Sequence, residues 1–77
     1  MPAERLANHL KALRAEKHLT QEALADLVGT TRKSINAIEM RRMVPSTLLA
    51  LKIARALDTS VEHVFSLVVD DGHAECR

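Results

Sequence analysis

The spacing of apolar residues along this chain of 77 residues predicts helices over most of its length. Leu6, Leu10 and Leu13 recur at helical intervals and indicate a first amphipathic helix over about 4–17. Similar patterns predict further helices over about 21–28, 32–39, 47–57 and 61–67. No segment shows the sustained alternation of apolar and polar residues that is typical of a strand. The pattern therefore predicts an all-α domain of five helices.

Polar residues between these segments mark the expected helix ends. Four hydroxyl residues stand directly before predicted helices, where a side-chain oxygen can accept a hydrogen bond from a free backbone N–H: Thr20, Thr31, Ser46 and Ser60. Gly29 follows the second helix, where a left-handed residue commonly ends a helix. His18 occupies the corresponding place after the first helix, and histidine is among the residue types that tolerate positive φ.

The apolar residues also predict which helix faces are buried. The expected inner faces of the second, third and fourth helices consist of Ala23, Leu24, Leu27 and Val28, of Ile35 and Ile38, and of Leu48, Leu51, Ile53, Ala54 and Leu57. The last apolar run allows two interpretations, because its side chains could close the core or form part of a dimer contact: Val64, Phe65, Leu67, Val68 and Val69. We expect one domain over 1–68, followed by an acidic, frayed tail over 69–77.

Composition excludes several classes of protein. Phe65 is the single aromatic residue, so binding of single-stranded nucleic acid by base stacking is disfavoured. The single cysteine, Cys76, cannot form an intramolecular disulfide, and neither a membrane span nor a signal-peptide core is evident, so we expect a cytoplasmic protein. His73 and Cys76 have ligand-like spacing but lack a second Cys or His pair, so we expect no metal and no cofactor. No nucleophile and base are grouped, so we expect no enzyme.

The net charge of +1 conceals an asymmetry between the two parts of the chain. Residues 1–57 contain ten Lys and Arg against five Asp and Glu, whereas residues 58–77 contain one Arg against five acidic residues. A basic body with an acidic end is compatible with an anionic partner that meets one face, although ordinary surface patterning would give the same asymmetry.

The connection between the second and third helices gives the clearest functional indication. Val28 to Thr31 form a short turn containing glycine, which is typical of a helix-turn-helix. The second helix of such a unit enters the DNA major groove. Arg32, Lys33 and Asn36 lie opposite the apolar face of the helix over 32–39. Arginine and lysine can donate to guanine, and asparagine can bond adenine through two atoms.

Several separated motifs resemble the phage-repressor/Cro-type (XRE-like) helix-turn-helix family. They are LTQEALA at 19–25, GTTRKSINAIE at 29–39, PSTL at 45–48 and ARAL at 54–57, followed by 61–65. The resemblance covers roughly residues 5–67 and implies a five-helix, lambda-repressor-like arrangement. His18 and Arg41 occupy positions where the family usually has glycine, and each would cost about 1 kcal/mol if held at positive φ. Ala23 replaces the glutamate that would complete a capping box with Thr20.

The resemblance also implies a role for individual residues. Gln21 would bond a phosphate and steady the recognition helix, and Thr31 and Ser34 would contact phosphates. Arg32, Lys33 and Asn36 would read bases. Arg41 or Arg42 would hold the neighbouring phosphates, although both could equally be solvated loop residues. Arg14 and Glu39 match positions that form a partly buried ion pair in relatives.

Together these features predict a transcriptional regulator, with repression as the expected direction. It would bind a double-stranded operator as a homodimer, because one recognition helix reads too few base pairs for useful specificity. One alternative is an antitoxin or restriction-control protein that regulates its own operon, and in either role a further protein partner is unidentified. The other alternative is a helical protein–protein adaptor that has lost DNA binding.

Overall fold

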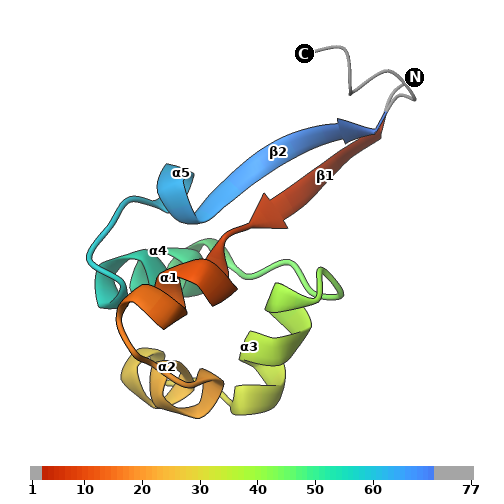
Figure 1. Ribbon diagram of the computed structural model, residues 1–77. Coiled ribbons are helices and arrows are strands. Elements are labelled where there is room, and N and C mark those ends of the chain that lie inside the picture. Colours follow the sequence, from red (N-terminus) through yellow and green to blue (C-terminus); the bar gives the residue numbers. More distant parts are fainter. Residues whose placement is uncertain (1–2, 71–77) are drawn as a thin grey trace.

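Five helices and a two-stranded antiparallel sheet make up residues 3–70, the part of the chain that the computed structural model describes (Figure 1). The elements follow in the order β1 (Ala3–Asn8), α1 (Leu10–Glu16), α2 (Gln21–Val28), α3 (Arg32–Glu39), α4 (Thr47–Ala56), α5 (Val61–Val64) and β2 (Phe65–Asp70). The helices form one body, and the β1–β2 ribbon extends from it (Figure 1). The expected five-helix domain is confirmed, with a small sheet added to it.

The sheet corrects the expected bounds of the first and last helices. Residues 3–8 pair with 65–70 in the register Leu6↔Leu67 and Asn8↔Phe65, so the first helix begins at Leu10 and the fifth ends at Val64. Leu6, Leu10 and Leu13 fit a helical period, but the partner of residues 3–8 is far away in the sequence. Local periodicity cannot reveal a pairing between segments that are far apart in the sequence. The β-branched residues of β2 do favour a strand, but they do not identify its partner.

The sheet also changes the expected end of the domain. β2 continues to Asp70, two residues beyond the boundary expected at 68. The rest of the acidic tail, including His73 and Cys76, lies outside the described residues.

Each of the four expected N-caps is formed. The side-chain oxygens of Thr20, Thr31, Ser46 and Ser60 accept hydrogen bonds from the backbone N–H groups of Ala23, Ser34, Leu49 and His63. Gly29 ends α2 with a φ of 74°, and its N–H bonds to the Ala25 carbonyl. His18 and Arg41 have φ values of 58° and 62°, as their positions predicted. Asp58 also adopts positive φ, at 57°, which the sequence pattern did not indicate.

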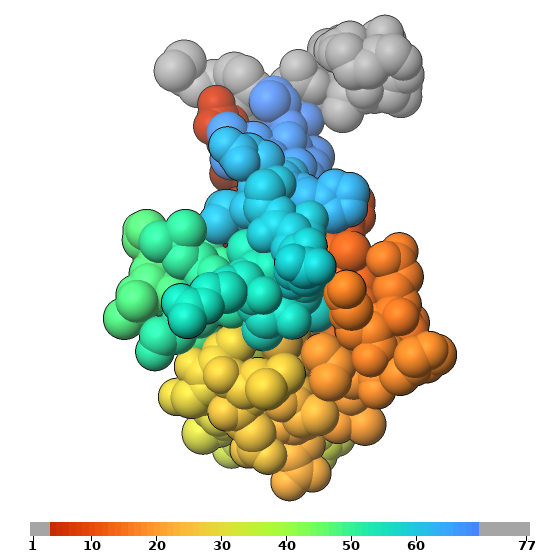
Figure 2. Space-filling model, turned by 90° about the vertical axis from the view of Figure 1, so that its left-hand side faces the viewer, coloured from red at the N-terminus to blue at the C-terminus, as the bar shows by residue number. Residues whose placement is uncertain are grey.

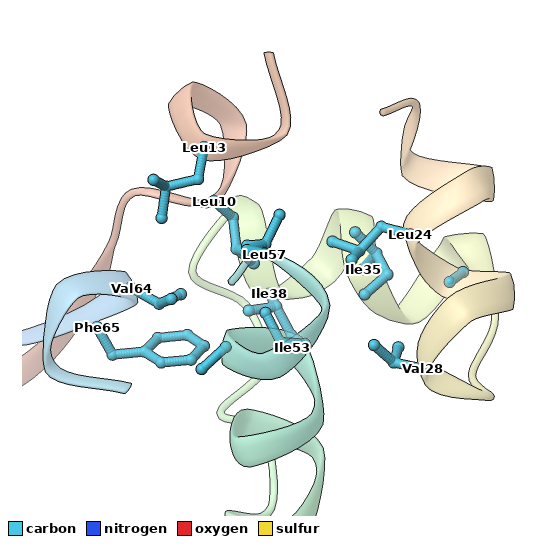
Figure 3. Packing of buried hydrophobic residues seen from close by; sticks show 12 residues of the cluster. Leu10, Leu13, Leu24, Val28, Ile35, Ile38, Ile53, Leu57, Val64 and Phe65 are labelled. Atoms are coloured by element: carbon cyan, nitrogen blue, oxygen red, sulfur yellow. The ribbon is translucent and has the colours of Figure 1, made fainter. Parts of the chain in front are cut away.

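The core lies where the helices meet (Figure 3). Every helix contributes at least one fully buried side chain, and these are Leu10, Leu24, Ile35, Ile38, Ile53, Leu57 and Val64. Phe65 closes one end, so Val64 and Phe65 belong to the core, whereas Leu67 and Val69 are exposed. Leu27, Leu48 and Leu51 were expected on inner faces but are 63%, 64% and 54% exposed. The apolar spacing along α2 and α4 predicts inner-face positions for these leucines. No neighbouring element covers the side of the helix on which they lie, so they are exposed.

Two leucines of α2 provide a direct test of this packing. Leu24 is fully buried, and Leu24→Ala should lower the free energy of unfolding by about 2–5 kcal/mol through lost burial and a residual cavity. The matched control Leu27→Ala, one turn away and exposed, should change it by about 0.5 kcal/mol or less. Urea unfolding followed by circular dichroism measures both values, and equal losses would contradict the assigned helix faces.

Candidate nucleic-acid interface

The turn between α2 and α3 fixes how α3 is presented. Gly29 ends α2 in a left-handed conformation that turns the chain toward α3, and Thr31 caps the start of α3 through its bond to the Ser34 N–H at 3.1 Å. The Thr31 hydroxyl also bonds the Ser34 hydroxyl at 3.1 Å. Ile35 and Ile38 then anchor one face of α3 in the core. The helix is therefore held at its start and along its inner face, and its outer face is left exposed.

The outer face of α3 carries the side chains that the sequence predicted to read bases. Arg32, Lys33 and Asn36 are all exposed and lie within the first five residues of the helix. Thr31 is also exposed, and Ser34 is half-buried beside it. The structure therefore brings all five of these predicted residues together at the N-terminal half of α3.

A carboxylate at the far end of α3 joins this helix to α1. Glu39 Oε2 accepts a hydrogen bond from Arg14 Nε at 2.5 Å, and Oε1 accepts from Arg14 Nη2 at 3.2 Å. The two side chains are 13% and 8% exposed, so the ion pair that the resemblance implied is present and largely shielded from water. Arg14 Nη1 also donates to the Leu19 carbonyl at 2.8 Å, which ties in the segment before α2. A two-pronged arginine–carboxylate pair fixes orientation as well as distance.

Gln21 connects the same carboxylate to the exposed face of α3. Its Nε2 donates to Glu39 Oε1 at 3.0 Å and to Asn36 Oδ1 at 3.2 Å. Both amide hydrogens of Gln21 are thus directed at α3. The sequence resemblance suggested that Gln21 steadies α3. Its two hydrogen-bond acceptors are distant from it in the sequence, so no local pattern indicated them.

Asn8 forms a second link to the end of α3 that sequence reasoning missed. Its Nδ2 donates to the Ile38 carbonyl at 3.0 Å, and its Oδ1 accepts from the Leu10 N–H at 3.1 Å. The Ile38 carbonyl also accepts from the Arg41 N–H, so the Asn8 amide is a second donor to an oxygen that has two lone pairs. Asn8 therefore joins β1, α1 and α3, and only the correct strand assignment could have indicated it.

The loop after α3 carries two exposed arginines. The Arg41 N–H donates to the Ile38 carbonyl at 3.0 Å, and the Arg42 N–H donates to the Ala37 carbonyl at 2.8 Å. These bonds, together with the positive φ of Arg41, turn the chain sharply at the helix end. Cations therefore lie at both ends of an eight-residue helix, which is about 12 Å long.

The described residues show no group suited to metal binding. Among them, no three His, Cys, Asp or Glu side chains gather closely enough to hold an ion. No helix in residues 3–70 is long and apolar enough to cross a membrane. Every buried polar side-chain atom in this part of the chain has a hydrogen-bond partner.

Comparison with known proteins identifies similar chains. Residues 10–64 match the family described as helix-turn-helix. An uncharacterized HTH-type transcriptional regulator of Bacillus subtilis, YgzD, is 47% identical over 62 residues, covering 80% of this chain and 94% of the relative. Another, MJ0272 of Methanocaldococcus jannaschii, is 43% identical over 60 residues, covering 78% and 91%.

A solved structure is similar as well. The restriction-modification controller protein C.AhdI from Aeromonas hydrophila superimposes with a TM-score of 0.67 at 37% identity, covering 70% of this chain and 82% of that one.

The Glu39 carboxylate offers a test of how α3 is held. Glu39→Ala should lower the free energy of unfolding by about 2–3 kcal/mol, between the values for exposed and fully buried pairs, because the Arg14 guanidinium loses its partner. Glu16→Ala, which removes an exposed carboxylate from α1, is the matched control and should change it by about 0.5 kcal/mol or less. Chemical denaturation measures both, and a Glu39→Ala variant as stable as the wild type would exclude a stabilising ion pair.

Proposed function

Because the chain belongs to the helix-turn-helix family, we propose that it is a sequence-specific regulator of transcription, acting as a repressor, that reads the major groove with α3. The observation that carries the proposal is the exposed group Arg32, Lys33 and Asn36 on a helix whose opposite face is fixed in the core. A helix held in this way can enter the groove without rearranging. The protein would work in the cytoplasm on nucleoid DNA and would have no catalytic activity.

Base reading would depend on three side chains. Arg32 and Lys33 would donate to guanine O6 and N7. Asn36 would bond adenine, accepting from N6 and donating to N7. Gln21 already donates to Asn36 Oδ1, which has a second lone pair for the base. The bond orients the Asn36 amide before DNA arrives, so less side-chain freedom is lost on binding.

Phosphate contacts would flank these base contacts. The Ser34 hydroxyl, which accepts from Thr31, can donate its own hydrogen to a phosphate. Arg41 and Arg42 would meet the backbone beyond the helix end. At Gln21 both amide hydrogens are used within the protein, so the phosphate contact would come from backbone N–H groups of the first turn of α2.

The protein would act as a homodimer on a two-fold symmetric operator, since one α3 spans too few base pairs. A second candidate role is control of a restriction–modification operon, which the similarity to C.AhdI favours. An antitoxin that regulates its own operon would use the same DNA surface. A protein adaptor without DNA binding is disfavoured by the exposed cations at both ends of α3.

Selection of bound sequences from a random duplex library tests the proposal. We expect an inverted repeat whose half-site centres lie about 10–10.5 base pairs, or a multiple, apart. Affinity for the selected site should fall steeply as salt rises, because phosphate contacts release counterions. No enrichment, or affinity insensitive to salt, would support the adaptor instead.

Replacement of Arg32 tests the reading residues on the selected site. Arg32→Ala should weaken specific binding by about 1–3 kcal/mol and relax the preference at one base position of each half-site. Lys52→Ala, which removes an exposed cation from α4, is the control and should leave the base preference unchanged. Fluorescence anisotropy with a set of singly substituted duplexes measures both effects. An unchanged preference in Arg32→Ala would remove that residue from base reading.

A further inference from the structure

Asn8 stands where the β1–β2 ribbon joins the helical body. Figure 1 and Figure 2 both show the ribbon projecting from that body, and Asn8 is the last residue of β1, at the base of the ribbon. It pairs directly with Phe65, which is buried in the core. The next N–H along the chain, that of His9, donates to the Val64 carbonyl at 2.8 Å. The backbone around Asn8 is therefore fixed against the core.

The side chain of Asn8 reaches from this fixed point to the end of α3. Its Nδ2 donates to the Ile38 carbonyl at 3.0 Å, and the Arg41 N–H donates to the same oxygen at 3.0 Å. Asn8 and Arg41 also line the same two hollows of the surface, so the two residues are close neighbours. Asn8 thus holds the carbonyl on which the turn after α3 closes.

Arg41 adopts a backbone conformation that a non-glycine residue leaves when it is free to do so. Its φ is 62°, in the left-handed region where the Cβ atom lies too close to the following carbonyl. Such a conformation persists only where the surroundings over-determine it. The bond from the Arg41 N–H to the Ile38 carbonyl is one restraint, and the Asn8 amide, which fixes that carbonyl from the ribbon, is another. Without the Asn8 donor, Arg41 can relax toward negative φ, which points its side chain in a new direction.

We propose that Asn8 is a positioning residue for DNA binding, which restrains Arg41 through the Ile38 carbonyl and so places its guanidinium for a phosphate contact. The inference rests on the proposed function, in which Arg41 meets the DNA backbone beyond the end of α3. Asn8 acts through Arg41 and makes no DNA contact of its own. A side chain of the ribbon therefore sets a contact that the loop after α3 makes.

A purely local role is the alternative, because Asn8 Oδ1 also accepts from the Leu10 N–H at 3.1 Å. That bond supports the start of α1 and does not involve α3. Asn8→Ser separates the two roles. A serine hydroxyl can also accept from the N–H two residues on, but its oxygen lies one bond closer to the backbone and falls short of the Ile38 carbonyl. The substitution changes no charge, so long-range electrostatics cannot account for an effect on DNA affinity.

A double-mutant cycle on the selected duplex tests the proposal. Asn8→Ser should weaken binding about three- to tenfold and reduce the slope of log affinity against log salt by about one per bound copy, the change expected for one lost phosphate contact. Arg41→Ala should reduce the slope equally. Asn8→Ser added to Arg41→Ala should weaken binding by less than about twofold more, because the positioned side chain is already gone. The control Ser66→Ala, at an exposed position of β2, should bind like the wild type.

The mobility of the loop in the DNA-free chain gives a second readout. Asn8→Ser should lower the heteronuclear NOE of the Arg41 and Arg42 amides, which reports motion on the picosecond to nanosecond timescale. Residues 32–36 should keep their wild-type values, and circular dichroism should show wild-type helicity. A merely structural role of Asn8 in α1 would leave the loop amides unchanged.

Several outcomes would overturn the proposal. One is an Asn8→Ser variant with wild-type affinity and salt slope, and another is equal weakening by Asn8→Ser with and without the Arg41 side chain. Arg41→Ala with an unchanged salt slope would also overturn it, whatever the stability of Asn8→Ser.

The two readouts separate failure of this inference from failure of the proposed function. If the wild type binds no duplex, the DNA-binding role falls, and the phosphate contact of Arg41 falls with it. If the wild type binds its selected duplex but the loop amides of Asn8→Ser match the wild type, the regulator function stands and the positioning role of Asn8 is overturned.

Discussion

One carboxylate joins α3 to two other helices and fixes its orientation against them. Glu39 accepts hydrogen bonds from Arg14 on α1 and from Gln21 at the start of α2, so three helices meet at its two oxygen atoms. Gln21 extends the connection to Asn36 on the exposed side. Because the ion pair is mostly shielded from water, its geometry is more tightly specified than that of a surface pair. The buried side of the domain thus sets the orientation of a side chain on its outer surface.

The core and this polar network have complementary effects. Ile35 and Ile38 supply burial, which holds α3 against the other helices but is non-directional. The hydrogen bonds of Glu39, Gln21 and Asn8 fix its rotation and its end. Strain from positive φ at His18 and Arg41 costs about 1 kcal/mol each, which these interactions offset. A rigid helix with an exposed cationic start is the result.

The helices and their caps could largely be predicted from the sequence, because these features are encoded locally. Helical periodicity located α2 and α3, and hydroxyl residues marked the caps that the structure contains. The ribbon could not be predicted in this way, since residues 3–8 pair with 65–70 and each half lacks a clear strand pattern alone. The same applies to the bonds from Gln21 and Asn8, which join distant residues. The exposure of Leu27 and Leu51 depends on which elements cover α2 and α4.

The surface that meets DNA can be measured directly by amide chemical shifts. In a titration of the isotope-labelled chain with a duplex carrying the selected site, the largest changes should fall on residues 21–22, 31–36 and 41–42. Amides of α4 and the ribbon should change little in a protein that is already dimeric. The largest changes on α4 or on the ribbon, with α3 unaffected, would contradict the assignment of α3 as the recognition helix.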